Sequence, residues 1–187
     1  MWFSVKGRRK SKSIKVGGRR LSDILAEHEK FFRREPGGVR ADLTGADLSK
    51  ADLRGVNLTD AILRNASLEE TDLRGAHLTR ADFSGAKMRK VDLRNTDMTE
   101  AILPGADLTE AQASGVEFFR CDMQGVSFRG ANLRNANFRN ANIRGTVLAG
   151  ADLGVAILRE TDLDGVDLSG VDLSTTLLPK NYKAASG

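Results

Sequence analysis

The chain has 187 residues, one cysteine and a net charge of +4 at neutral pH. This length suits one domain with a core of its own, which excludes the small scaffolds that depend on disulfides or metals for stability. Cys121 has no internal partner, which fits a reducing compartment. The first residues lack the apolar run of a signal peptide or a membrane span, so we expect a cytoplasmic protein or one held peripherally at the inner membrane.

The positive charge is concentrated near the N-terminus. Twelve Lys/Arg against four Asp/Glu give residues 1–40 a net charge of +8, whereas seventeen against twenty-one give residues 41–187 a net charge of −4. The sequence therefore divides into a basic N-terminal arm, residues 1–20, and a mildly acidic body.

The arm contains no acidic residue. Its candidate contacts for an anionic partner are Lys6, Arg8, Arg9, Lys10, Lys12, Lys15, Arg19 and Arg20. Such a block attracts the phosphates of nucleic acid or of a membrane surface. It can equally be a solvated, flexible tail, because charge runs often have no more specific role. Phe3 and Val5 alternate with polar residues, as do Ile14 and Val16, which is also compatible with a small hairpin.

A short amphipathic helix is predicted over residues 21–34. The apolar residues at near-helical spacing are Leu21, Ile24, Leu25, Phe31 and Phe32. Ser22 or Asp23 can serve as the N-cap, and the Glu-Pro-Gly-Gly sequence of residues 35–38 ends the helix. Because so short a helix is marginal alone, we expect its apolar face to cover the open end of the following domain. His28 is expected opposite this face, as a surface or capping residue.

From Ala41 to Thr175 the sequence repeats every five residues without insertion or deletion. The first residue of each unit is small and the third is large and apolar. Residues two apart on a strand share a face, so both point inward. The next inward residue comes three positions later, which requires a corner between units. Each unit is therefore a short strand followed by a turn.

The fifth residues of the units indicate four sides to each coil. Taken every twenty residues, one column reads Lys50, Glu70, Lys90, Glu110, and another reads Asp60, Arg80, Glu100, Arg120. Charges alternate along both columns, so neighbours in adjacent coils attract each other. The other two columns consist of glycine and asparagine, which tolerate positive φ. The two pairs of opposite corners are therefore expected to differ in turn type.

This run, which starts Ala41-Asp42-Leu43, resembles the bacterial pentapeptide-repeat proteins and their A-(D/N)-L-x-x unit. The resemblance implies an all-β solenoid, a right-handed quadrilateral β-helix. Twenty-seven units predict about seven coils, in a rod roughly 33 Å long. The chain then consists of the arm (1–20), a capping helix and lead-in (21–40), the β-helix (41–180) and a C-terminal tail (181–187).

The sequence offers little material for catalysis. His28 and His77 belong to no evident constellation with Ser, Cys or metal ligands, and Cys121 occupies a small inward position. We therefore expect no enzyme, no cofactor and no metal. One unit departs from the pattern, because Ala113 replaces the large apolar residue. We expect Phe118 and Phe128 to fill that volume.

Three outward features are candidate contacts. Arginines 54, 74 and 94 form a column beside aspartates 52, 72 and 92, for which self-neutralisation is favoured over a docking stripe. Phe119 interrupts a column of threonines at an outward position. A belt of fourth-position arginines encircles the rod and can bind an anionic surface or direct stacking between molecules: Arg129, Arg134, Arg139 and Arg144.

These features favour a non-catalytic scaffold or protein-interaction module, with the basic arm as a second contact for an anionic partner. The resemblance also implies a rival, because the quinolone-resistance members of the family mimic DNA and bind type II topoisomerase. A body charge of only −4 argues against that rival. A second rival is a peripheral membrane protein anchored by Trp2, Phe3 and the basic arm. Unpaired strand edges at the C-terminal end predict end-to-end homodimers.

Overall fold

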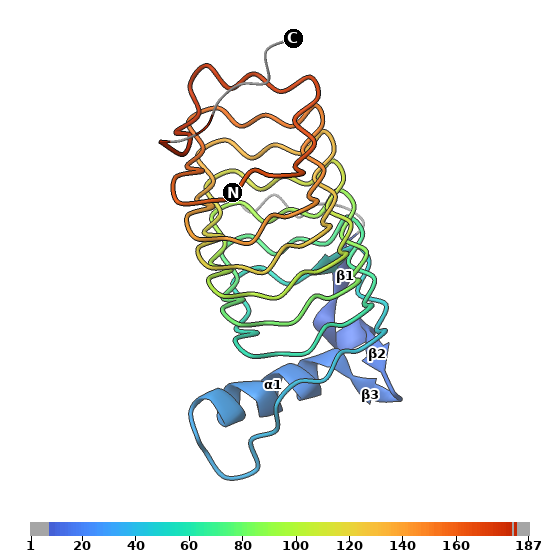
Figure 1. Cartoon of the computed structure of the whole chain (residues 1–187). Helices are drawn as coiled ribbons and strands as arrows, with labels where there is room; N and C mark the ends of the chain where they lie inside the picture. Colours follow the sequence, from blue (N-terminus) through green and yellow to red (C-terminus); the bar gives the residue numbers. More distant parts are fainter. Residues whose placement is uncertain (1–7, 181, 183–187) are drawn as a thin grey trace, which may run out of the picture.

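The computed structural model describes residues 8–180 and 182 and shows a rod of stacked coils (Figure 1). The elements in chain order are β1 (Arg9–Lys10), the short helix η1 (Ser11–Ser13), β2 (Lys15–Val16), β3 (Arg19–Arg20), α1 (Leu21–Phe32) and β4 (Ala51–Asp52), the last of which lies in the first coil. α1 lies across the N-terminal end of the stack, and the coils continue from there to the C-terminal end (Figure 1).

Each coil contains 20 residues, because second-position residues form parallel bridges to the residue 20 positions later. These bridges run from residues 42 and 62 to residues 157 and 177. The Leu43 N–H donates to the Ile62 carbonyl at 2.7 Å, and the Ile62 N–H donates to the Ala41 carbonyl at 3.0 Å. Four five-residue units thus form one four-sided coil, and each coil satisfies the backbone of its neighbours.

All four corners use the same backbone geometry. Every fifth-position residue from 45 to 170 has a φ between 55° and 70°, including charged residues such as Lys50 and Glu70. Nearly all of the turns are closed by a bond such as that from the Ala46 N–H to the Leu43 carbonyl, 3.0 Å long. The prediction that the two pairs of corners differ in turn type is wrong. The hydrogen bonds of the 20-residue register hold all of these corners at positive φ, and this overrides the local preference of charged residues for negative φ.

First-position and third-position side chains fill the interior, as the period predicts. Leu43, Leu48 and Leu58 are fully buried. Higher in the rod, Phe118 and Phe138 stack with their ring centroids 5.1 Å apart, and Phe128 meets Phe118 edge-on at 5.6 Å. Aromatic pairs in these geometries add to the stability gained from burial alone.

Polar first-position residues are also buried, because each donates to the backbone of the preceding coil. Five threonines form this bond to the carbonyl 23 residues earlier: Thr71, Thr96, Thr146, Thr161 and Thr176. Cys121 occupies an equivalent position, and its thiol donates to the Met98 carbonyl at 2.8 Å. Burial raises the pKa of Cys121 to about 12, so the thiol is a core group rather than a reactive thiolate, as predicted.

Residues 8–20 form an ordered part of the N-terminal end rather than a solvated tail. β1 pairs in parallel with β4, with Arg9 opposite Ala51, and the Arg9 N–H donates to the Lys50 carbonyl at 2.8 Å. β2 and β3 form a small antiparallel hairpin, in which Val16 pairs with Arg19. Phe3 and Val5, the other residues that suggest a hairpin, lie outside the described residues. Ile14 is fully buried in the core. For residues 8–20 the interpretation as a flexible tail is wrong, because a strand edge and an apolar anchor hold them on the rod.

The observed helix α1 begins at Leu21, as predicted, but it is shorter and has a different N-cap. It ends at Phe32 rather than residue 34, and its N-cap is Arg20, without a side-chain cap from Ser22 or Asp23. Phe31 and Phe32 are 39% and 52% exposed, so the buried face does not extend to the end of the helix.

His28 is part of the buried face of α1, contrary to the prediction. It follows Leu21 and Ile24 at helical positions i+7 and i+4, and all three are buried. The His28 Nδ1 accepts a hydrogen bond from the Ala41 N–H at 3.1 Å, which joins the helix to the first coil. Burial lowers the pKa of His28, so the neutral imidazole is the form that fits this site.

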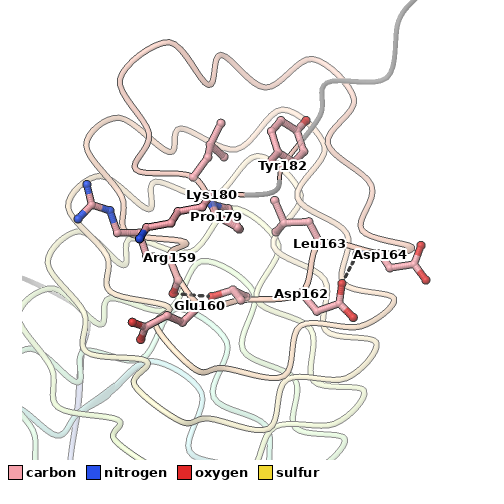
Figure 2. A pocket seen from close by; sticks show the side chains of 10 residues that line it. Arg159, Glu160, Asp162, Leu163, Asp164, Pro179, Lys180 and Tyr182 are labelled. Atoms are coloured by element: carbon pink, nitrogen blue, oxygen red, sulfur yellow. Dashed lines mark hydrogen bonds between the residues drawn. The ribbon is translucent and has the colours of Figure 1, made fainter.

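The C-terminal end of the rod is less completely covered. Leu163, Leu168 and Leu173 of the last coil are only half-buried, whereas third-position leucines of the first coil are fully buried. An open cavity of about 1070 Å³ lies at this end, lined by residues 159–164, 178–180 and 182 (Figure 2). The described residues therefore cover the two ends of the rod unequally.

The aromatic cluster leads to a stability prediction for Ala113, which is fully buried in the same coil as Phe118. If the phenylalanines fill the space that a leucine normally takes, Ala113→Leu overpacks the core and destabilises the protein by about 1–3 kcal/mol. Urea unfolding measures this change, with Leu133→Met as the volume-conserving control. Unchanged or increased stability of Ala113→Leu would show an unfilled space instead.

Candidate functional site on the outer faces of the rod

The basic residues at the start of the chain mostly contact the rod itself. Arg9 and Lys10 form ion pairs of 2.8 Å with Asp47 and Asp52. Arg8 donates to the Glu70 carbonyl at 2.8 Å. These three cations, which the sequence suggests as contacts for an anionic partner, therefore neutralise acids of the first coils.

Asp72 is the most deeply buried acid of this region, with a side chain only 1% exposed. Its two carboxylate oxygens accept hydrogen bonds of 2.9 and 2.7 Å from the Arg74 guanidinium, and the Arg8 Nε lies 3.6 Å away. Burial opposes ionisation of Asp72, but the Arg74 hydrogen bonds and the Arg8 charge outweigh it and lower the pKa of this carboxyl. Arg8 thus helps to keep a buried carboxylate ionised.

The remaining basic residues of the arm differ in their surroundings. Arg19 pairs with Glu27 of α1. Lys12, Lys15 and Arg20 are exposed and have no ion pair among the described residues. Lys6 lies outside the described residues, as do Trp2 and Phe3, so their predicted roles stay predictions.

The arginine column beside the aspartates neutralises itself, as predicted. Arg54 and Arg94 each form a two-pronged bond to the aspartate two residues earlier, with distances of 2.7–2.9 Å. Arg54 also lies 3.7 Å from Asp72 in the next coil. Such bidentate pairs fix both side chains, so this face offers few free charges to a partner.

The charged corners pair between coils, which confirms the interpretation of their alternation. Arg80 binds Asp60 through two hydrogen bonds of 2.7 and 2.9 Å. Longer ion pairs of 3.5–3.9 Å join Lys50 to Glu70, Lys90 to Glu110 and Arg120 to Glu100. Exposed pairs of this kind each contribute little stability, but they remove charge from the corners.

The arginine belt has one member on each side of the rod rather than a single surface. All four side chains are exposed. Arg134 contacts Asp152 at 3.3 Å, and it occupies space that a side chain at Gly154 would need. Within residues 8–180, Arg129, Arg139 and Arg144 form no ion pair. Because they lie on different sides, a flat partner cannot contact all four together.

Two asparagines beside the belt arginines, Asn137 and Asn142, have a role that the sequence interpretation missed. The Asn137 carbonyl oxygen accepts the Arg139 N–H at 3.1 Å, while its amide nitrogen donates to Glu117 at 2.8 Å. Asn142 repeats both contacts, with Asp122 as the acid. The sequence signal for Asn137 and Asn142 is the acid 20 residues before each of them: an amide can donate to that acid, whereas an aspartate would repel it.

Phe119 lies close to two arginines. The Arg120 guanidinium carbon lies 4.9 Å from the ring centroid, and that of Arg139 lies 5.9 Å from it. The ring itself is half-buried. These contacts fix the orientation of an outward aromatic side chain and bring two predicted contacts, Phe119 and Arg139, together on one face.

The described residues contain two cavities of interest and no cluster of three or more His, Cys, Asp or Glu side chains that could hold a metal ion. One cavity is the open C-terminal end of Figure 2. The other, of about 600 Å³, lies between the end of α1 and the coil face that carries His77 and Arg80. Among the described helices none has the length and apolar character needed to span a membrane.

Replacement of Asn137 tests its pairing with Glu117. In Asn137→Asp two carboxylates meet, which raises their pKa values in the folded chain, so we expect a loss of about 1 kcal/mol at neutral pH. The loss should grow as the pH rises through these raised pKa values and vanish at acidic pH, where both carboxyls are protonated in either state. Chemical denaturation across this pH range measures it.

The matched control combines Asn137→Asp with Glu117→Gln, which reverses the direction of the hydrogen bond and removes the repulsion. This double variant should regain most of the lost stability. An equal, pH-independent loss in both variants would show that charge repulsion is not the cause.

The repeat region matches a known sequence family and known structures. The family model for pentapeptide repeats matches residues 39–75, 76–112, 114–148 and 136–174 with eight copies. Two trypsin-treated variants of QnrB1, a plasmid-mediated fluoroquinolone resistance protein, have TM-scores of 0.63 and 0.55. Each is 21% identical to this chain and covers 76% of it and 79% of its own length.

A pentapeptide repeat protein of the cyanobacterium Cyanothece 51142, Rfr23, is 22% identical over 84% of this chain and 99% of that chain, with a TM-score of 0.35. No curated protein matches the sequence. The likeness to QnrB1 concerns the fold alone, because the identity is so low. The family model covers most of the repeat region, and the chain belongs to the pentapeptide-repeat family, whose members form right-handed quadrilateral β-helices.

Proposed function

We propose that this protein is a non-catalytic protein-interaction module, a rod that presents fixed side-chain ladders to a protein partner. The observation that supports this most strongly is the division between the inside and the outside of the coils. First-position and third-position side chains are buried along most of the rod, and the corners share one backbone geometry. Chemical variety is therefore confined to second, fourth and fifth positions on the outside.

The N-terminal segment has a different part in this proposal from the one that the sequence suggests. Arg8, Arg9 and Lys10 are used in contacts with the rod, and β1 covers part of the first coil. We therefore assign residues 8–20 to the stability of the N-terminal end, together with α1, and place the partner contacts on the coils.

The likeness to QnrB1 raises the question of DNA mimicry, which needs a strongly anionic rod. Here Asp52, Asp72 and Asp92 each accept hydrogen bonds from an arginine of the same face. Most of the charged corners pair in the same way, and the arginine belt adds positive charge. The outer charges thus favour a mixed protein-binding surface over a mimic of the DNA backbone.

Self-association at the C-terminal end belongs to the same proposal. The half-buried leucines of the last coil and the exposed Leu177 leave apolar surface at this end of the rod. A second copy of the chain that covers these residues would bury them from water. A solution mass equal to that of the monomer, at high protein concentration, would contradict this part of the proposal.

Affinity capture from the native cell tests the protein-interaction function. We expect the immobilised full chain to retain a discrete protein partner about tenfold more strongly than an immobilised QnrB1 control, which shares the fold but differs in its surface. Nuclease treatment should leave the captured protein in place, and excess protein should leave gyrase supercoiling unchanged. Retention that depends on nucleic acid, or inhibition of gyrase, would contradict the proposal.

A further inference from the structure

One face of the rod changes character along its length. Its second positions are bridged from residue 57 to residue 177, and its fourth positions read Thr59, Thr79, Thr99, Phe119, Arg139 and Arg159. The threonines are buried or half-buried, whereas the two arginines are exposed. Toward the N-terminus the fourth-position column of this face is therefore uncharged and has short side chains. Toward the C-terminus the column carries an aromatic ring and two cations. We call residues 119, 139, 157 and 159 the Phe119 surface.

The Phe119 surface combines fixed and free groups. The Phe119 ring is held by the guanidinium groups of Arg120 and Arg139 at 4.9 and 5.9 Å. Ile157, a half-buried second-position residue, lies in the ladder between Asn137 and Leu177, and Leu177 is 38% exposed. Figure 2 shows Arg159 projecting outward from the rod beside Lys180. An oriented aromatic ring beside arginines is a common core of protein-binding surfaces.

The acids around this surface are already engaged. Glu100 lies 3.8 Å from Arg120. Glu117 accepts a hydrogen bond of 2.8 Å from Asn137, and Glu160 accepts one of 3.2 Å from Asn140. Within the part of the chain that the structure describes, Arg139 and Arg159 have no ion pair. Arg139, beside the Phe119 ring, and Arg159, in the next coil, thus present guanidinium groups without an acid partner.

We propose that the Phe119 surface docks an acidic segment of a protein partner. Carboxylates of the segment would bind the Arg139 and Arg159 guanidinium groups, and apolar side chains of the segment would lie on the Phe119 ring and on Ile157, which is two coils away. Guanidinium groups match carboxylates with paired hydrogen bonds, and neighbouring coils place the two arginines about 4.8 Å apart along the ladder. This inference rests on the proposed protein-interaction function and names the surface and the chemistry of the partner.

The same observations disfavour nucleic acid and lipid as the occupant. A nucleic-acid backbone needs a track of cations, with about 6–10 phosphate contacts for strong binding. On this face the ladder below Arg139 carries Glu117 and Asp97 instead. An anionic membrane gains about 1 kcal/mol for each basic residue near its surface, so two arginines on one face give weak attachment. Arg129 and Arg144 lie on other sides of the rod and cannot add to it.

Binding of two matched peptides to the full chain tests the proposal. One fluorescein-labelled peptide alternates glutamate with leucine over eight residues, and the other carries glutamine in place of every glutamate. We expect the glutamate peptide to bind about tenfold more tightly by fluorescence anisotropy. The combined substitution of Arg139→Ala and Arg159→Ala should remove this preference, and Phe119→Ala should weaken binding of both peptides.

Arg144→Ala is the matched control, because it removes an exposed belt arginine from another side of the rod and should leave peptide affinity unchanged. Thermal melts check that each variant is folded. The proposal is overturned if the glutamate peptide fails to bind at millimolar concentration or if Arg144→Ala weakens it equally. It is also overturned if a single-stranded oligonucleotide or a phosphatidylserine vesicle binds more tightly through Arg139 and Arg159.

Failure of this inference can be distinguished from failure of the proposed function. A photo-crosslinking residue placed at Thr99, next to the Phe119 surface, should capture the partner, whereas one at Ser84 on another face should not. Capture only from Ser84 retains the interaction function and refutes this surface. If neither position captures a protein, both the Phe119 surface and the protein-interaction function are contradicted.

Discussion

The hydrogen-bonded register of 20 residues is the constraint on which the rest of the structure depends. Each coil donates and accepts backbone hydrogen bonds with the coils before and after it, so no coil can change its path alone. This explains why Lys50 and Glu70 adopt the positive φ that glycine takes at other corners. It also explains why the buried hydroxyl of Thr71 reaches a carbonyl of the previous coil at 2.7 Å.

The same register determines which outer charges are available to a partner. Side chains 20 residues apart lie above one another, so an acid and a base in one column pair, as Asp60 and Arg80 do. An asparagine above an acid donates to it, as Asn137 does to Glu117. Where a column places Arg139 next to Phe119 and Arg159, the nearby acids Glu117 and Glu160 are engaged with asparagines instead. The free cations of the rod thus follow from the order of residues within columns, and the proposed binding surface is where such a column meets an aromatic ring.

Much of this arrangement could be predicted from the sequence, because a strict five-residue period assigns each residue to the inside, the outside or a corner of a coil. The inward positions, the 20-residue coil and the pairing of charged corners all follow from counting. The N-terminal end could not be predicted in the same way, since it has no period. Nothing local in the sequence places Arg8 beside Asp72, 64 residues later, or shows that residues 9 and 10 add a strand to the first coil. The polarity of His28 suggests an exposed residue, whereas its position four residues after Ile24 puts it on the buried face of the helix.

Residues 8–32 cover the first coil, because they pair with its backbone and bury its apolar end. Among the described residues the last coil lacks an equivalent cover. Hydrogen exchange followed by mass spectrometry tests this directly in the full chain. We predict that amides of residues 51–58 exchange as slowly as those of residues 91–98, and that amides of residues 161–173 exchange faster. Exchange of residues 51–58 that is as fast as that of residues 161–173 would show that the N-terminal segment does not seal the rod and would contradict the account.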